Sequence, residues 1–75
     1  MTAEQIGSLF EKFGKSNLRI ISFTSGSRYL ISDEERDLVV FDDESEILHF
    51  RDHAPKLVIS CWHYDCIDGL QFDVV

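Results

Sequence analysis

The chain has 75 residues, 44% of them hydrophobic and 12% aromatic, and its 14 acidic residues against seven Lys and Arg give a formal net charge of −7. This length fits one small domain over residues 1–75, and the apolar content excludes a disordered chain. The acidic balance argues against direct binding to nucleic acid or an anionic membrane, because neutralising phosphates takes Lys and Arg. We therefore expect a protein partner with a basic surface, or a charge that serves only solubility.

No segment is suited to cross a membrane. The longest uncharged and mainly apolar run, residues 57–64, is far shorter than the ~20 residues that a membrane helix needs. Glu4 stands early and no basic stretch precedes it, so we expect no cleaved secretion signal and a cytoplasmic location. In a reducing compartment Cys61 and Cys66 are expected to be free thiols, although their spacing would allow a short disulfide-closed loop.

Residues 2–13 are predicted to form a helix. Thr2 can act as the N-cap, and Gln5 three positions later completes a capping box that satisfies backbone donors at the helix start. Gly14 suits the position just after the last turn. One face of this helix is apolar at helical spacing and is expected to be buried; it consists of Ala3, Ile6, Leu9, Phe10 and Phe13.

The rest of the chain has the pattern of short strands separated by turn signals. The predicted strands cover residues 19–24, 28–32, 38–41, 46–51, 57–63 and 70–74, with a turn over residues 65–69. Short connections imply antiparallel pairing, since parallel neighbours need long crossovers. We expect an α+β fold in which the N-terminal helix packs on a strongly bent antiparallel sheet of five or six strands.

The predicted core combines the helix stripe with one face of each strand. A strand shifted by one residue would present the opposite set of side chains, so the chosen faces are the least constrained part of the prediction. The strand residues expected in the core are Ile21, Phe23, Leu30, Val39, Phe41, Leu48, Phe50, Leu57, Ile59, Leu70 and Phe72.

The end of the chain is similar to the strand–turn–strand segment that completes small barrels. This segment is Trp62–His63–Tyr64–Asp65–Cys66–Ile67–Asp68–Gly69–Leu70–Gln71–Phe72. With a helix followed by bent strands before it, the chain resembles the Sm-like and SH3-like small barrels in outline. The resemblance implies a small-barrel fold and nothing about activity. Sm-like proteins that bind RNA would be expected to have a basic loop marked by Asn or Gly, and the sequence has none.

Five potential zinc ligands fall close together: His49, His53, Cys61, His63 and Cys66. Zinc is usually held by four Cys or His side chains in close pairs. Cys61 and His63 would lie on the same face of a strand, whereas Cys66 follows them at an odd spacing and would not. The sequence also has no pair of cysteines separated by only two residues. The alternative is a buried cysteine with surface histidines, and we expect no metal or other cofactor.

The same region has the residue types of a nucleophile and a base. Cys61 or Cys66 could pair with His63, oriented by Asp65 or Asp68. However, so small a fold leaves little room for a substrate pocket, and no glycine-rich turn that would bind an oxyanion or phosphate is present. The sequence therefore predicts a protein that is not an enzyme.

Two acidic loops are the most distinctive feature of the charge pattern. Their spacing does not fit a calcium loop, which needs alternating acids, a central Gly and a distal Glu. If both loops lie on one side of the sheet, they concentrate a negative field there; otherwise they are ordinary solvated turns. The acids are Asp33, Glu34, Glu35, Asp37, Asp42, Asp43, Glu44 and Glu46.

Large amphipathic side chains are the usual anchors of a protein interface, and Tyr29, Trp62 and Tyr64 are the candidates here. We expect a small, acidic, non-catalytic module that docks on a basic surface of a partner. By analogy of size and charge, accessory and inhibitor proteins of phages and mobile elements are of this kind. The alternatives are a small-barrel subunit that forms homo-oligomers through the edge strand ending in residues 72–75, and a small zinc-binding domain.

Overall fold

The computed structural model describes residues 1–51 and 61–73. The predictions that involve residues 52–60 and 74–75 lie outside this part of the chain, among them the core positions Leu57 and Ile59, the ligand candidate His53 and most of the predicted strand 57–63. The described elements are α1 (Ala3–Phe13), β1 (Leu18–Phe23), β2 (Arg28–Leu30), β3 (Val39–Asp42), β4 (Ile47–Phe50), β5 (Cys61–His63) and β6 (Ile67–Phe72), with the 3₁₀ turns η1 (Lys15–Asn17), η2 (Arg36–Leu38) and η3 (Tyr64–Cys66).

The helix α1 begins and ends as its sequence predicts. The Gln5 N–H donates to Thr2 Oγ1 at 3.1 Å, and the Thr2 N–H donates to Gln5 Oε1 at 3.0 Å, so the capping box is confirmed. Gly14 follows with a positive φ of 85°, and its N–H donates to the Phe10 oxygen at 2.8 Å. This backbone conformation favours glycine, which explains why the helix stops there.

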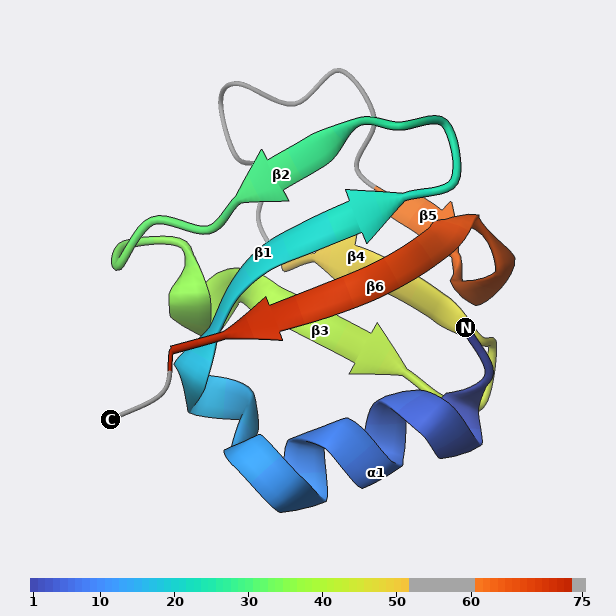
Figure 1. Ribbon diagram of the computed structural model, residues 1–75, viewed down its shortest axis with the longest axis horizontal. Helices are drawn as coiled ribbons and strands as arrows, with labels where there is room; N and C mark the ends of the chain where they lie inside the picture. The colour runs from blue at the N-terminus through green and yellow to red at the C-terminus, as the bar shows by residue number, and fades with distance from the viewer. Residues whose placement is uncertain (52–60, 74–75) are drawn as a thin grey trace.

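The strands form two three-stranded antiparallel sheets, with the orders β2-β1-β6 and β3-β4-β5. The α+β class is thus confirmed, with α1 running below both sheets in Figure 1. Among the described residues no ladder joins one sheet to the other, so neither the single sheet of five or six strands nor a closed small barrel is confirmed. The chain passes from the first sheet to the second through the charged segment 31–38, which includes η2, and returns from β5 to β6 through η3.

The core is assembled from α1, both sheets and η3. Predicted members that are buried include Ile6, Ile21, Phe23, Val39, Leu48 and Phe50, and the buried set also contains Leu18, Ile31, Tyr64 and Ile67. Phe10, Phe41, Leu70 and Phe72 are half-buried and pack against it.

The prediction that Leu30 is buried is wrong, because 70% of its surface is exposed. Tyr29 pairs with Ile21 in the β1–β2 ladder and so shares the inward face of that buried residue. Alternation along β2 then turns Leu30 outward. The prediction thus placed the buried face of β2 one residue away from its actual position, an error that is easily made for a short strand.

Candidate functional site

Three segments that are far apart in the sequence meet around Tyr64. The amino group of Met1 donates hydrogen bonds to the backbone oxygens of Tyr64 and Ile67, each 2.8 Å long. The Tyr64 N–H donates to the Glu46 oxygen at 2.9 Å, which ties the β3–β4 turn to the same residue. The start of α1, the β3–β4 turn and η3 therefore form one end of the molecule, on the side marked N in Figure 1.

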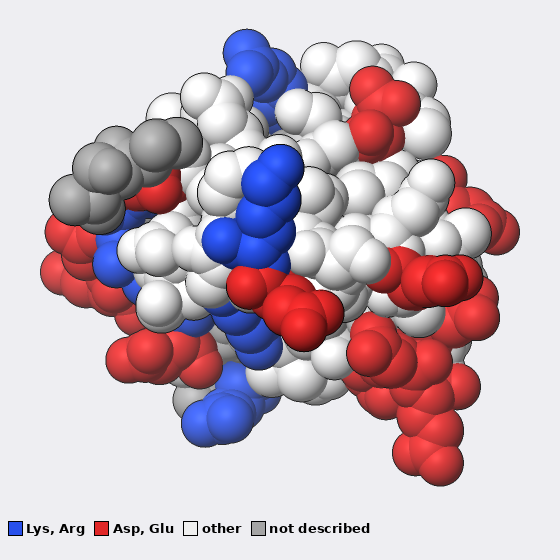
Figure 2. All heavy atoms as spheres, turned by 60° about the horizontal axis from the view of Figure 1, so that its bottom comes forward, with Lys and Arg blue, Asp and Glu red and all other residues white. Residues whose placement is uncertain are grey.

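This end of the molecule is strongly acidic. The segments that build it, residues 1–9, 42–48 and 63–69, contain no Lys or Arg. All three ion pairs found among the described residues lie elsewhere. This end is on the right in Figure 2, where carboxylates gather and most Lys and Arg of the visible face lie farther to the left. We call this surface the acidic end, and its members are Glu4, Asp42, Asp43, Glu44, Glu46, Asp65 and Asp68.

The β3–β4 turn holds its acids in a defined shape. Asp42 Oδ1 accepts hydrogen bonds from the Glu44 N–H at 3.0 Å and the Ser45 N–H at 3.3 Å, as in a tight Asx turn. Glu46 has a positive φ of 54°, in the left-handed region that Gly and Asn adopt more readily. The turn therefore carries an exposed glutamate at a position where the backbone favours another residue.

Tyr64 was a candidate docking anchor, and the structure makes it a structural residue of this end. Its side chain is buried, with 1% of the residue exposed, because η3 turns the ring inward. Its hydroxyl donates to Asp43 Oδ1 at 2.7 Å. Burial, this hydrogen bond and the charges of Asp43, Asp42 and Glu46 raise the pKa of the Tyr64 phenol well above its usual value.

The second acidic loop does not join the acidic end. Residues 33–37 precede β3 and residues 42–46 follow it, so the two loops lie at opposite ends of that strand (Figure 1). The two loops therefore do not form one acidic surface on the same side, which was one of the two alternatives that the sequence left open. The 33–37 loop is also partly neutralised, since Asp33 accepts from Arg19 at 2.8 Å and from Arg36 at 2.7 Å.

Tyr29 and Trp62 are half-buried, and both contact the core. The Tyr29 hydroxyl donates to Glu35, which also accepts from the Ser32 hydroxyl at 2.8 Å. Trp62 lies opposite the buried Leu48 in the β4–β5 ladder, and its ring centroid is 5.2 Å from that of Phe23. Both rings thus have partners inside the molecule, and neither belongs to the acidic end.

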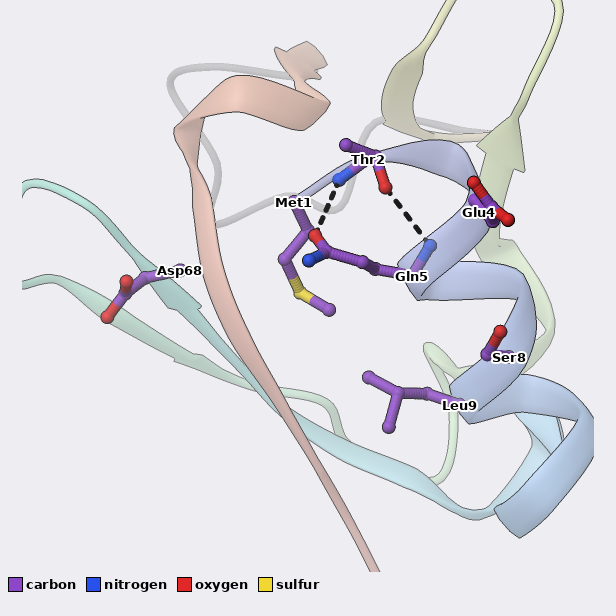
Figure 3. Close-up of a pocket in the computed structure, with 7 residues that line it drawn as sticks. All are labelled: Met1, Thr2, Glu4, Gln5, Ser8, Leu9 and Asp68. Carbon is purple, nitrogen blue, oxygen red and sulfur yellow. Dashed lines mark hydrogen bonds between the residues drawn. The ribbon is translucent and has the colours of Figure 1, made fainter.

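A hollow of about 610 Å³ lies between the first turns of α1 and β6, beside the acidic end. In Figure 3, Met1, Gln5 and Leu9 project toward β6, the strand from which Asp68 comes. Glu4 is also part of the lining. Its lining includes the apolar side chains of Met1 and Leu9 and two carboxylate residues, of which Asp68 points away from α1 in Figure 3. Apolar and acidic groups together suit the stem and the charged tip of a Lys or Arg side chain.

The candidate metal ligands do not converge within the described part of the chain. No group of three or more His, Cys, Asp or Glu there is placed to hold a metal ion. His49 and His63 share the outer face of the β4–β5 ladder, where His49 pairs with Cys61 and His63 with Ile47 along the backbone. Cys66 has an exposed free thiol in η3, beyond the end of β5.

Three of the seven acids at the acidic end, Glu4, Asp65 and Asp68, were not predicted from the sequence to bind a partner. Each stands apart from the two acidic runs, so charge density along the chain does not reveal it. The signal that could have found them is the shared lack of Lys and Arg in the three segments that meet at Tyr64.

Comparison with protein-family models, with curated proteins and with solved structures finds no similar protein. Among the described helices, none has the length and apolar character needed to cross a membrane.

Proposed function

We propose that this chain is a non-catalytic binding module whose acidic end docks on a basic surface of a protein partner. The observation that carries the proposal is the convergence of seven carboxylates on three segments without Lys or Arg. Such a cluster creates an attractive field that acts over about 8 Å at physiological salt. Its main effects are to speed association and to orient the partner.

The fixed shape of this surface supports the same proposal. Hydrogen bonds donated by the Met1 amino group and the Tyr64 hydroxyl, and one accepted by the Asp42 side chain, hold the three segments in place. A surface that is already ordered loses little conformational entropy on binding, so more of the electrostatic attraction contributes to affinity. The basic groove of a nucleic-acid enzyme is a surface of suitable charge. An inhibitor of such an enzyme, as an accessory protein of a phage or mobile element, is the form of the function that we propose.

Charge neutralisation confined to the acidic end is expected to weaken partner binding about tenfold at low salt and to reduce its salt dependence. The variant carries Glu44→Gln, Glu46→Asn and Asp65→Asn. Asp42 and Asp43 stay unchanged because their carboxylates hold the turn and the Tyr64 hydroxyl. Partner proteins captured from the native host with wild-type protein as bait are identified by mass spectrometry, and the affinity of the purified pair is then measured over a salt series.

The matched control removes three negative charges elsewhere, through Glu11→Gln, Glu34→Gln and Asp37→Asn. All three residues are exposed and lie outside the acidic end. The control should bind like the wild type, because its charges lie on the last turn of α1 and in the 33–37 loop, outside the three segments that form the contact. Equal losses in both triple variants would mean that total charge alone matters, and unchanged affinity in the acidic-end variant would contradict the docking surface.

A homo-oligomer is the second candidate, and the position of β6 favours it. Among the strands that the structure describes, β6 pairs with β1 and is outermost in its sheet, so a second copy could pair with its other edge. We infer a small-barrel subunit as the unit of such an assembly, supported by the antiparallel pairing of β1 with β6. Light scattering should then show a mass that rises from monomer to dimer with concentration, whereas a monomer at every concentration would contradict this candidate.

A further inference from the structure

A second hollow, of about 390 Å³, lies at the other end of β3 and has the opposite charge. Lys15 of η1, Arg36 of η2 and Arg51 after β4 line it together with Ser16, Asp37 and the first two residues of β3. The Arg51 N–H donates to the Leu38 oxygen at 2.7 Å, which fixes the end of β4 beside η2. Three of the seven Lys and Arg of an acidic chain therefore meet at one hollow.

These cations are only partly neutralised by the protein. Within residues 1–51 and 61–73, neither Lys15 nor Arg51 takes part in an ion pair. Arg36 donates from Nη2 to Asp33 at 2.7 Å, while its Nε is buried and has no acceptor in the same part of the chain. A buried donor without an acceptor costs free energy, so the protein does not fully satisfy the Arg36 guanidinium. Since like charges repel at close range, the arrangement favours binding of an anion between them.

We propose that this hollow binds a phosphate group, as inorganic phosphate or a small phosphate monoester. Three cations and the Asp37 carboxylate give the lining a formal net charge of +2, which the Asp33 carboxylate paired with Arg36 reduces. The remaining positive charge attracts a phosphate monoester, which carries about −1.5 to −2 at neutral pH. Arginine guanidinium groups donate paired hydrogen bonds to phosphate oxygens, and Ser16 adds a hydroxyl. The Asp37 carboxylate can accept from a hydroxyl of the ligand.

A nucleic-acid strand fits this hollow less well than a small ligand. Binding along a strand requires basic contacts to several successive phosphates. Here the cations surround a single hollow, while the opposite end of β3 carries the acidic end, which repels a polyanion. The geometry thus selects one phosphate group rather than a chain of them.

The test is an NMR titration of the full chain with inorganic phosphate and, separately, with dimethyl phosphate, at constant ionic strength. Inorganic phosphate should shift the amide signals of Lys15, Ser16 and Asp37 to saturation. Dimethyl phosphate carries a single charge, so it should bind at least about fivefold more weakly. Lys15→Gln with Arg51→Gln should weaken phosphate binding at least about tenfold, since each lost partner is a charged hydrogen-bond donor.

Lys12→Gln with Arg28→Gln is the matched control. It removes the same charge from exposed side chains outside the hollow, and its phosphate affinity should stay within about twofold of the wild type. The spectra of both variants report directly whether they are folded. Shifts that never saturate, equal weakening in both double variants, or tighter binding of a single-stranded oligonucleotide than of phosphate would each overturn the proposal.

Discussion

Replacing Tyr64 with alanine is expected to lower the free energy of unfolding by about 4 kcal/mol, because it removes a buried aromatic ring and leaves a cavity. The ring lies at the junction of the core and the acidic end, with its centroid 6.1 Å from that of Phe41. A chain of this size has a total stability of roughly 4–11 kcal/mol. The variant should therefore keep no more than roughly 7 kcal/mol and unfold at a much lower urea concentration than the wild type.

Tyr64→Phe separates the packing of the ring from the hydrogen bond of its hydroxyl. It keeps the ring and loses only the bond to Asp43, so we expect a cost of about 1 kcal/mol. Urea unfolding can be followed by the fluorescence of Trp62, which is half-buried against Phe50 and Phe23. His63→Ala is the control, because this exposed neighbour should change stability by less than about 0.5 kcal/mol. A cost of the same size for Tyr64→Ala and His63→Ala would show that Tyr64 is not a core residue.

The helix could be predicted from the sequence because its signals are local. Thr2, Gln5 and Gly14 act within one turn of their own positions, and the structure uses all three as expected. For the same reason, the predicted bounds of most strands lie within one or two residues of the observed bounds, since β-branched runs and turn residues mark these strands. The exception at the end of the chain is β6, which begins at Ile67 inside the predicted turn 65–69, because η3 completes the reversal within residues 64–66.

Long-range relations could not be predicted in the same way. The side that a strand buries depends on its register with a neighbour. For that reason Tyr29, a candidate anchor, faces the core, while Leu30, which was expected there, is exposed. The two acidic loops look alike in the sequence, yet the direction of β3 sends them to opposite ends. The acidic end depends on contacts of Tyr64 with residues on two other segments, at Met1 and in the β3–β4 turn, which no local pattern contains.

Alkaline pH is expected to unfold the protein through its two tyrosines. Burial, with the hydrogen bond to Glu35 and its charge, raises the pKa of Tyr29 to about 12, and the pKa of Tyr64 is raised by burial and by Asp43. In the unfolded chain both phenols ionise near pH 10. The folded state thus holds protons that the unfolded state releases, so the stability due to neutral phenols is complete below about pH 10 and is lost as pH rises toward 12 and beyond.

The expected loss by about pH 11 is roughly 2 kcal/mol for the pair, after allowing for solvent screening at the partly exposed Tyr29. Circular dichroism and the ultraviolet absorbance of tyrosinate should change together, because the phenols ionise when the chain unfolds. The double variant Tyr29→Phe with Tyr64→Phe starts from lower stability but should lose much less of it over the same pH range. Tyrosinate that forms near pH 10 with unchanged circular dichroism would contradict the prediction, since it would mean that both hydroxyls are open to solvent instead of bonded to Glu35 and Asp43.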